Sequence, residues 1–241
     1  MSELKTTFNS QAELYNNARP KYPTELFEYL ITTTSLQEDA QLLEVGPGTG
    51  QATKPLAEKG FNITAIELGD HLAKVAKREL ESFKNVKIIT GAFEEADFKD
   101  KRYDLIYSAT AFHWIKPEYK YVKTHELLKE KGHLVIIHTH HVSDEEGDTF
   151  FHASQPIYEK YMPSKEKGKE FHLPLLTNLK PEELDEKLFA LISFQTFPLV
   201  KNYTADKYTQ LLSTYSPVIS LEPKVRQNFL NDIAELINTN F

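Results

Sequence analysis

The sequence predicts an α/β protein built on a doubly wound, mainly parallel sheet, with a helical N-terminal cover and a helical insertion after the fifth strand. Short apolar runs alternate with amphipathic segments between about residues 41 and 139. These runs are continuously apolar, which is typical of parallel strands that helices cover on both faces. Beyond residue 140, apolar residues recur at helical spacing, so helices are expected to follow the sheet.

Five strands are expected, at residues 41–45, 61–66, 86–90, 103–108 and 133–139. A glycine-rich turn and a helix to about Lys59 follow the first strand. Asp70 suits the N-cap of the helix after the second strand. Pro117 suits the first turn of a helix that reaches about Glu130, and Gly132 is expected to end that helix before the fifth strand.

After the fifth strand, residues 141–190 are expected to form amphipathic helices around the polar segment 163–170, which would lie over the strand ends. Residues 193–200 return to strand character, and a final helix is expected from about Glu222 to Asn238. No last strand is evident after Asn238. We interpret the chain as a single domain that comprises a leader, a core, a helical cap and a C-terminal part, at residues 1–35, 36–140, 141–190 and 191–241.

Composition restricts the function. The formal net charge of −7 disfavours nucleic acid as a partner, because phosphate binding draws on lysine and arginine. The chain has no cysteine, which excludes disulfides, thiolate nucleophiles and cysteine-bound zinc. No apolar run is long enough for a signal peptide or a membrane helix. We therefore expect a cytoplasmic protein that has neither nucleic acid nor a membrane as partner. Its expected oligomeric state is a monomer or homodimer.

The segment 42–51 carries the most specific signal. An apolar strand leads into Gly46, Gly48 and Gly50, and a helix follows. Glycine permits a tight turn and a close approach of ligand to backbone, and the N–H groups at a helix start favour an anion. An ordinary turn is one reading. A nicotinamide dinucleotide site is disfavoured, because its fingerprint needs a further small residue where Gln51 or Thr53 stands.

Glu67 ends the second strand, where a carboxylate can accept hydrogen bonds from both hydroxyls of a ribose. A glutamate in this place is by itself often a solvated strand end. In combination with the glycine turn it points to a ligand that contains adenosine. The expected site therefore lies at the carboxyl ends of the strands.

These residues resemble the class I S-adenosylmethionine-dependent methyltransferases. Glu44, the three glycines and Glu67 are similar to that superfamily's first motif and its ribose-binding acid. A closer resemblance, to the trans-aconitate methyltransferase-like subgroup, is carried by residues 91–95 and 108–114 and by the leader residues Phe8, Tyr15 and 19–23. The resemblance covers roughly residues 8–140 and implies S-adenosylmethionine as the cofactor.

The resemblance also implies roles for single positions. Backbone at Gly46 and Gly48 would face the methionine part of the cofactor, Glu44 would bind its ammonium group, and Glu67 would hold the ribose. The remaining cofactor contacts would come from Leu68 beside the adenine, Ala92 and Phe93 at its border, backbone carbonyls of Ser108 and Ala109 near the sulfonium, and Tyr15 and Arg19 closing the pocket.

His113 is the candidate catalytic residue, because it follows the fourth strand, where the methyl group is expected to point. It would act as a base or orient the acceptor, and the alternative is that it only bonds a loop. His138 and His140 would share one face of the fifth strand, but no carboxylate has clear ligand spacing and we expect no metal.

The expected function is methyl transfer from S-adenosylmethionine to a small molecule. The subgroup resemblance suggests a carboxylate or hydroxyl oxygen as the methyl acceptor. A carboxylate would need no base, whereas a protonated acceptor would. Two alternatives stay open at this point. The first alternative is a non-catalytic module that binds the cofactor, and the second is a methyltransferase that acts on RNA or protein.

Overall fold

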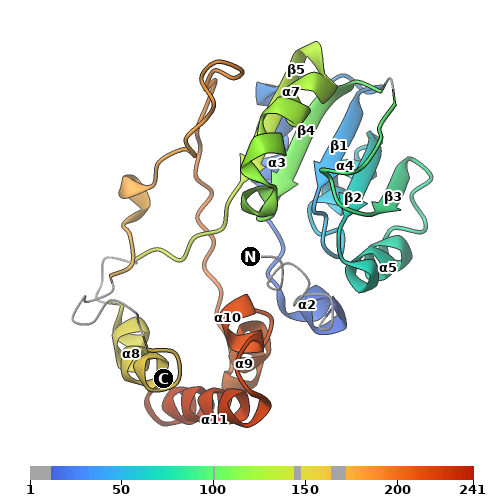
Figure 1. The fold of residues 1–241 in the computed structure, drawn as a ribbon. Helices are drawn as coiled ribbons and strands as arrows, with labels where there is room; N and C mark the ends of the chain where they lie inside the picture. The colour runs from blue at the N-terminus through green and yellow to red at the C-terminus, as the bar shows by residue number, and fades with distance from the viewer. Residues whose placement is uncertain (1–11, 100, 144–147, 164–171) are drawn as a thin grey trace. The chain divides into compact units, whose positions relative to one another are not determined.

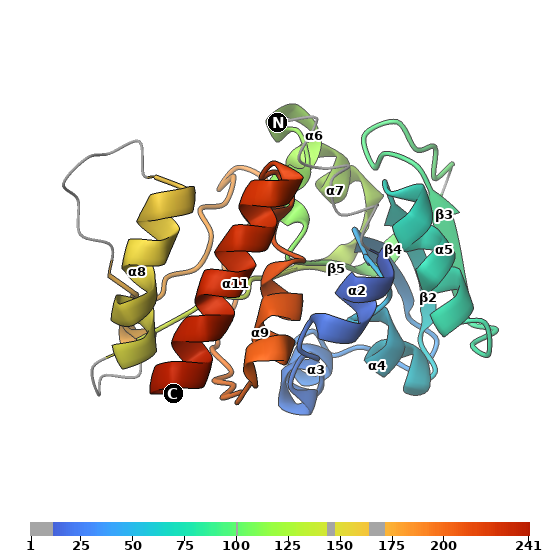
Figure 2. The same cartoon turned by 90° about the horizontal axis from the view of Figure 1, so that it is seen from below.

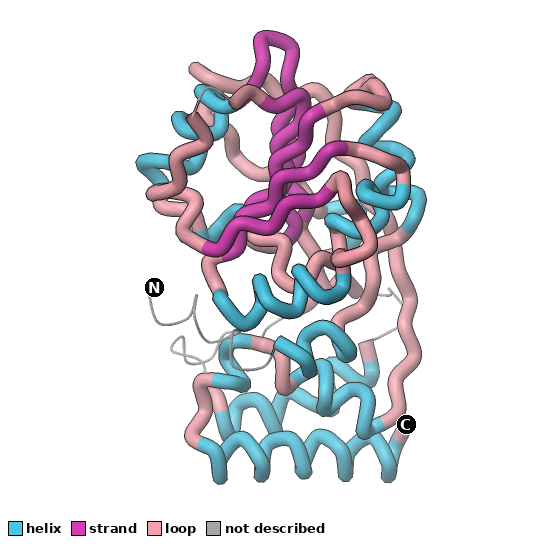
Figure 3. The backbone as a smooth tube through the Cα atoms, turned by 90° about the vertical axis from the view of Figure 1, so that its right-hand side faces the viewer, coloured by secondary structure: helices cyan, strands magenta, loops and turns pink. Residues whose placement is uncertain are grey.

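Five parallel strands in the order β3-β2-β1-β4-β5 form one sheet in the computed structural model, which describes residues 12–99, 101–143, 148–163 and 172–241 (Figures 1 and 3). The chain adds strands outward from β1 to β3, then returns to place β4 on the other side of β1. This reversal creates a topological switch point between β1 and β4. The strands are β1 Gln41–Val45, β2 Asn62–Glu67, β3 Val86–Thr90, β4 Tyr103–Ala109 and β5 Leu128–Ile137.

The predicted doubly wound parallel sheet is confirmed, and the first four strands lie within one residue of their expected ends. The fifth was placed wrongly: β5 begins at Leu128 and ends before His138. Gly132 therefore lies inside the strand instead of breaking a helix. The register of β4 against β5 shifts between Tyr103 and Leu105, and a Cβ added to Gly132 would lie 2.8 Å from the carbonyl oxygen of Tyr103. The close approach of backbone at this irregularity explains the glycine.

Helices cover both faces of the sheet, because successive strand residues point to opposite sides. On one face, Leu42 packs in a cluster with Phe27 and Leu56 from α3 and α4. On the other, Leu43 packs with Phe112 and Leu127. The helices around the sheet are α2 Ala12–Ala18, α3 Thr24–Thr33, α4 Thr53–Glu58, α5 Asp70–Glu79, α6 Pro117–Lys120 and α7 Val122–Leu127, with the short 3-10 helix η2 at Phe112–Trp114.

Two expected helix ends differ from the structure. Gly69 is the N-cap of α5, and Asp70 is its first helical residue. The negative charge of Asp70 still interacts favourably with the helix dipole at this end. The helix that begins at Pro117 is broken at Tyr121 into α6 and α7, and it ends at Leu127 instead of Glu130. The residues after Leu127 are taken by the sheet, so pairing with β4 overrides local helix propensity.

Contacts divide the chain into two units. The first comprises residues 1–16, 20–139 and 181–199 and contains the sheet; the second comprises residues 17–19, 140–180 and 200–241. In the second unit, α11 packs against α8 and α9 around the buried side chains of Phe229 and Ile233 (Figure 2). Its elements are α8 Thr149–Tyr161, η3 Leu176–Asn178, α9 Ala205–Leu212, α10 Ser216–Ile219 and α11 Pro223–Asn240. The division of a single domain into leader, core, cap and C-terminal part stays a prediction.

The region after β5 is less regular than expected. The described part of residues 141–190 forms one α-helix, α8, and the short η3, whereas most of the polar segment 163–170 and the leader residue Phe8 lie outside the described residues. Residues 193–200 form no strand. Val200 is 88% exposed and Ile192, just before the segment, 68%, so these apolar side chains lack the burial that a strand of this sheet provides. The final helix is confirmed as α11. No helix in the described ranges has the length and apolar character to cross a bilayer.

Candidate active site

The glycine turn lies directly after β1, as expected. Gly46, Gly48 and Gly50 all have positive φ values, of 74°, 59° and 92°. A Cβ added to Gly46 would lie 2.4 Å from the Cβ of Ala111, and one added to Gly50 would lie 2.8 Å from Leu80. The turn therefore needs glycine both for its backbone conformation and for its close packing.

Glu67 ends β2 beside this turn. Its carboxylate accepts hydrogen bonds from the backbone N–H groups of Gly48, at 2.8 Å, and Gly69, at 2.9 Å. The side chain is 7% exposed. Burial raises the pKa of Glu67 and outweighs the opposing effect of the backbone N–H groups. The structure thus brings the two parts of the predicted motif into direct contact.

Glu44 lies fully buried in β1, behind the turn. Its Oε2 atom accepts hydrogen bonds from the hydroxyls of Thr53, at 2.6 Å, and Tyr107, at 2.7 Å. Burial and, to a smaller extent, the charge of Glu67 raise the pKa of Glu44 to about 7, against the effect of these two hydrogen bonds. Within the described part of the chain, Oε1 of Glu44 and the hydroxyl of Thr49 are buried without a hydrogen-bond partner.

Thr53 and Tyr107 were not predicted from the sequence as site residues. Tyr107 is the register partner of Glu44 across β1 and β4, so it is the strand pairing that brings the two together. Thr53 is the first residue of α4. Thr53 could have been identified from the sequence, because it follows the glycine turn. Tyr107 could not, because its place beside Glu44 depends on β1 and β4 being neighbours in the sheet.

Hydrogen bonds join the end of β4 to the ends of its neighbouring strands β1 and β5. The buried Ser108 donates its hydroxyl proton to the carbonyl oxygen of Val45, at 2.7 Å, which ties the ends of β4 and β1 together. Ala109 is also buried. The next residue, Thr110, donates its N–H to the carbonyl oxygen of Ile137 in β5, at 2.8 Å. The predicted residues Ser108 and Ala109 therefore lie beside the turn, on the strand that leads to His113.

The residues expected around the adenine lie near the ends of β2 and β3. Gly91 donates its N–H to the carbonyl oxygen of Glu67, at 2.8 Å, which brings the segment after β3 beside β2. Leu68 is exposed, Ala92 is half-buried, and the ring of Phe93 is buried in the core against Phe98. The side chain of Phe93 therefore belongs to the core, and a ligand contact of this residue would have to come from its backbone.

The two leader residues belong to different units. Tyr15, in the first unit, lies next to the turn, since a Cβ added to Gly48 would be 3.6 Å from its ring. Arg19 belongs to the second unit, where it donates a hydrogen bond to the carbonyl oxygen of Thr214, at 3.0 Å, and its guanidinium lies 4.2 Å from the ring centre of Tyr215. A cofactor contact of Arg19 stays a prediction.

His113 lies in η2, after β4, with an exposed side chain whose ring packs against Trp114, at 4.7 Å between ring centres. Partial burial lowers the pKa of His113, and the nearby side chains of His138 and Lys120 lower it further, whereas the charge of Glu182 opposes them. The predicted candidate is therefore one member of a polar cluster that the sequence did not reveal.

Glu182 is the centre of this cluster. Its Oε2 atom lies 2.7 Å from Nε2 of His138, and its Oε1 atom forms an ion pair with Lys120 and accepts a hydrogen bond from Tyr121, at 3.2 Å. Burial raises the pKa of Glu182, but the hydrogen bonds from Lys120 and His138 outweigh it, so the pKa is lowered overall. Glu182 was expected in a helical cap, so its contact with the end of β5 was not foreseen.

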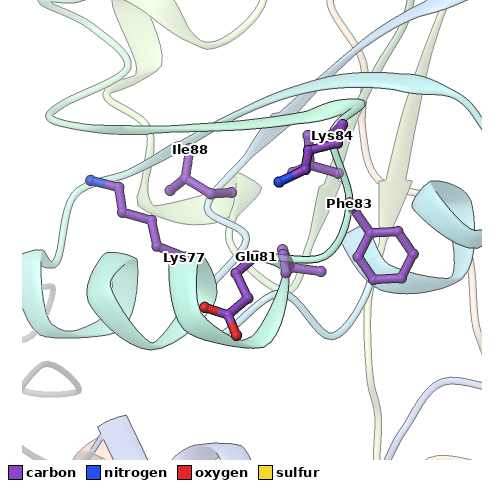
Figure 4. A pocket seen from close by; sticks show the side chains of 7 residues that line it. Lys77, Glu81, Phe83, Lys84 and Ile88 are labelled. Carbon is purple, nitrogen blue, oxygen red and sulfur yellow. The ribbon is translucent and has the colours of Figure 1, made fainter.

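Among the described residues, no group of three or more histidine, aspartate or glutamate side chains is arranged to hold a metal. Two pockets in this part of the chain lie away from the predicted site residues. A pocket of about 240 Å³ lies between the end of α5 and β3, with Lys77 and Glu81 on one side and Ile88 on the other (Figure 4). A second, of about 430 Å³, lies between residues 94–99 and helices α6 and α7. Neither is lined by a predicted site residue.

Comparison with known proteins agrees with this geometry. A family model described as a methyltransferase domain matches residues 43–136, which span β1 to β5. An uncharacterized methyltransferase of Schizosaccharomyces pombe is 26% identical over 235 residues, which cover 97% of this chain and 88% of that protein. One of Alkaliphilus oremlandii is 30% identical over 158 residues, covering 60% of this chain and 71% of that protein.

Among solved structures, the CcbJ methyltransferase of Streptomyces caelestis is 22% identical, with a TM-score of 0.48, over 55% of this chain and 57% of that one. The parallel sheet itself, and not this similarity, identifies the fold. The relative that is 30% identical, of which this chain covers 71%, leads to the same conclusion as the strand order and the matched family model. The chain belongs to the class I S-adenosylmethionine-dependent methyltransferases.

Proposed function

We propose that this enzyme transfers the methyl group of S-adenosylmethionine to an oxygen of a small molecule, and that Glu44, Glu67 and the glycine turn hold the cofactor. The observation that carries the proposal is the contact between Glu67 and the turn, with the carboxylate 2.8 Å from the N–H of Gly48. A ribose needs a buried acceptor in such a place, beside backbone that a ligand can approach closely.

The chemistry of the buried groups fits the cofactor. Oε1 of Glu44 and the hydroxyl of Thr49 are polar atoms that the described residues leave without a hydrogen bond. Such atoms are costly to bury unless a ligand or water satisfies them. An ammonium group supplies donors, and Oε1 of Glu44 is an acceptor. We therefore assign the amino acid part of the cofactor to Glu44 and the adenosine part to Glu67, Leu68, Ala92 and the backbone of Phe93.

S-adenosylmethionine supplies an electrophilic methyl group on a positively charged sulfur. The work left to the protein is to align the acceptor with that group and to exclude water, an effect of several kcal/mol in well-oriented systems. We assign the backbone of Ser108 and Ala109 to the sulfonium end and His113 to the acceptor. Tyr15 and Arg19 are proposed to contribute from the leader.

A small acceptor is supported by the charge of the chain. A net charge of −7 opposes an RNA phosphate backbone. The resemblance to the trans-aconitate methyltransferase-like subgroup is part of this proposal, and it suggests a carboxylate or hydroxyl oxygen as acceptor. Salt-dependent methylation of RNA, or methylation of a protein, would contradict this choice of acceptor.

Calorimetry with S-adenosylmethionine tests the cofactor site. Glu67→Ala is expected to weaken binding by about 1–3 kcal/mol, because charge-assisted hydrogen bonds to the ribose are lost. Glu58→Ala, an exposed glutamate at the end of α4, is the matched control and is expected to bind as the parent does. Unchanged affinity in Glu67→Ala would contradict the assignment. Transfer of a labelled methyl group across a metabolite library tests the acceptor.

A further inference from the structure

A carboxylate–imidazole pair stands at the carboxyl end of β5. His138 directly follows the last strand residue, Ile137, and Glu182 reaches it from residues 181–199 of the same unit. The Nε2–Oε2 distance is 2.7 Å, and the side chains of His138 and Glu182 are 32% and 19% exposed. This geometry is that of a charge-assisted hydrogen bond.

The pair fixes the state of the imidazole ring. An ionised carboxylate can only accept hydrogen bonds, so Nε2 of His138 must be the donor. In the neutral ring the proton then resides on Nε2, and Nδ1 carries the lone pair. Glu182 is held ionised because the hydrogen bonds from Lys120 and His138 lower its pKa overall, despite burial. A carboxylate that orients a histidine in this way is a recurring device for proton transfer.

The charges around the pair disfavour an anionic acceptor. Lys120 is bound by Glu182, and both side chains are mostly buried, at 17% and 19% exposed. The charge of Lys120 is therefore already compensated. Among the described residues, the groups around the pair include His113 from η2, Lys120 from α6 and Tyr121, whose hydroxyl also bonds Glu182 and whose other acidic neighbour is Asp185. A neutral acceptor that carries a proton suits this surrounding better than a carboxylate does.

The pair also lies on the acceptor side of the switch point. The cofactor is assigned to the ends of β1 and β2, where Glu67 and the glycine turn lie. The neighbouring ends of β4 and β5 bear His113 and His138. The loop after β4 closes directly onto the turn, since Ala111 occupies the space that a side chain at Gly46 would need. Ligands of parallel sheets bind at this edge.

We propose that His138 is the base that receives the proton of a hydroxyl acceptor, and that Glu182 is the residue that positions it. This inference rests on the proposed function and narrows its acceptor to a hydroxyl group. The acceptor oxygen bonds to the methyl carbon as the carbon–sulfur bond breaks, and the electron pair of that bond stays on sulfur. The O–H bond of the acceptor breaks, and its proton passes to Nδ1 of His138.

The ring state is measured without any acceptor. In protein with isotope-labelled histidine, nuclear magnetic resonance is expected to show His138 as the Nε2–H form. In Glu182→Gln, whose amide can both donate and accept, a mixture of both forms is expected. Glu183→Gln is the matched control, because the exposed Glu183 meets the cluster through its backbone carbonyl. A Nδ1–H ring in the parent, or a ring unaffected by Glu182→Gln, would overturn the proposal.

Transfer of a labelled methyl group to a panel of alcohols and phenols, and to a matched panel of carboxylic acids, tests the acceptor. Transfer to the hydroxyl panel is expected, with a loss of about 100- to 10,000-fold in His138→Gln at unchanged cofactor affinity. Glu182→Gln is expected to lower kcat more than it raises KM, because the amide no longer holds the ring in the single form that can accept the proton. Glu183→Gln is expected to keep full activity.

Transfer to carboxylic acids alone, transfer to neither panel, or full activity in His138→Gln would each refute the role of His138. Loss of S-adenosylmethionine binding in the parent protein would instead refute the proposed cofactor site. Calorimetry on the same samples therefore separates a failure of this inference from a failure of the proposed function.

Discussion

Glu44→Gln is expected to change the pH dependence of stability, because it replaces a buried acid by a neutral group of the same shape. Glu44 is fully buried, and burial raises its pKa from 4.5 to about 7 in the folded chain. Between these two values the unfolded chain has released the proton that the native state retains. The unfolding free energy of the parent therefore falls as the pH rises through this window.

The size of the effect follows from the two pKa values. A tenfold difference in acidity corresponds to about 1.4 kcal/mol. The interval from 4.5 to about 7 then amounts to about 3 kcal/mol of stability lost by the parent. Glutamine has no proton to lose, so this loss is missing in the variant. Other effects of the substitution on stability, such as the cost of burying an unpaired amide, do not vary with pH.

Urea unfolding of both proteins from about pH 4.5 to about pH 8, without cofactor, measures the effect. The variant's unfolding free energy minus the parent's is expected to rise by about 3 kcal/mol across this range. The exposed Glu58→Gln is the control and is expected to give a flat difference. A flat or falling difference for Glu44→Gln would refute the reasoning. Saturating S-adenosylmethionine is expected to reduce the rise, because its ammonium group would favour the ionised acid.

Three further substitutions test the packing by urea unfolding. Gly50→Ala is expected to cost about 1–3 kcal/mol, since φ is 92° and the added carbon would lie 2.8 Å from Leu80; equal stability would contradict this close packing of the turn. Ser108→Ala is expected to cost about 1–3 kcal/mol, because the carbonyl of Val45 loses its donor, and a neutral result would show that water replaces it. Phe229→Ala is expected to cost about 3–5 kcal/mol, because the ring is fully buried in the second unit, and a small change would mean that its cavity collapses.

The sheet was predictable because its signal is local. Strands such as 41–45 and 86–90 are short apolar runs bounded by turns, and the structure has the same limits. The start of β5 was not predictable, since Leu128 is followed by three charged residues that continue a helical pattern, and only pairing with β4 makes this segment a strand. Residues 193–200 show the opposite error. Their apolar character suggested a strand, but the structure gives them no partner strand within the described sheet.

Some residues of the candidate site were likewise predictable from the sequence, and others were not. The glycines and Glu67 were identifiable because their spacing along the chain encodes the turn and the strand end. The contact of Glu44 with Tyr107 depends on the order of strands in the sheet, which one sequence does not state. The contact between His138 and Glu182 spans 44 residues and joins a strand end to an irregular segment. No periodic pattern marks such a contact in advance.

The fit of Ala111 against Gly46 limits how this enzyme can acquire a new specificity. A Cβ at position 46 would lie 2.4 Å from the Cβ of Ala111, so position 46 has no room for a side chain. If the proposed acceptor side is right, a change of substrate by mutation is expected at His113 or in residues 181–183 instead, where side chains are more accessible. Natural or laboratory variants with altered selectivity are therefore expected to keep glycine at position 46, whatever else they exchange.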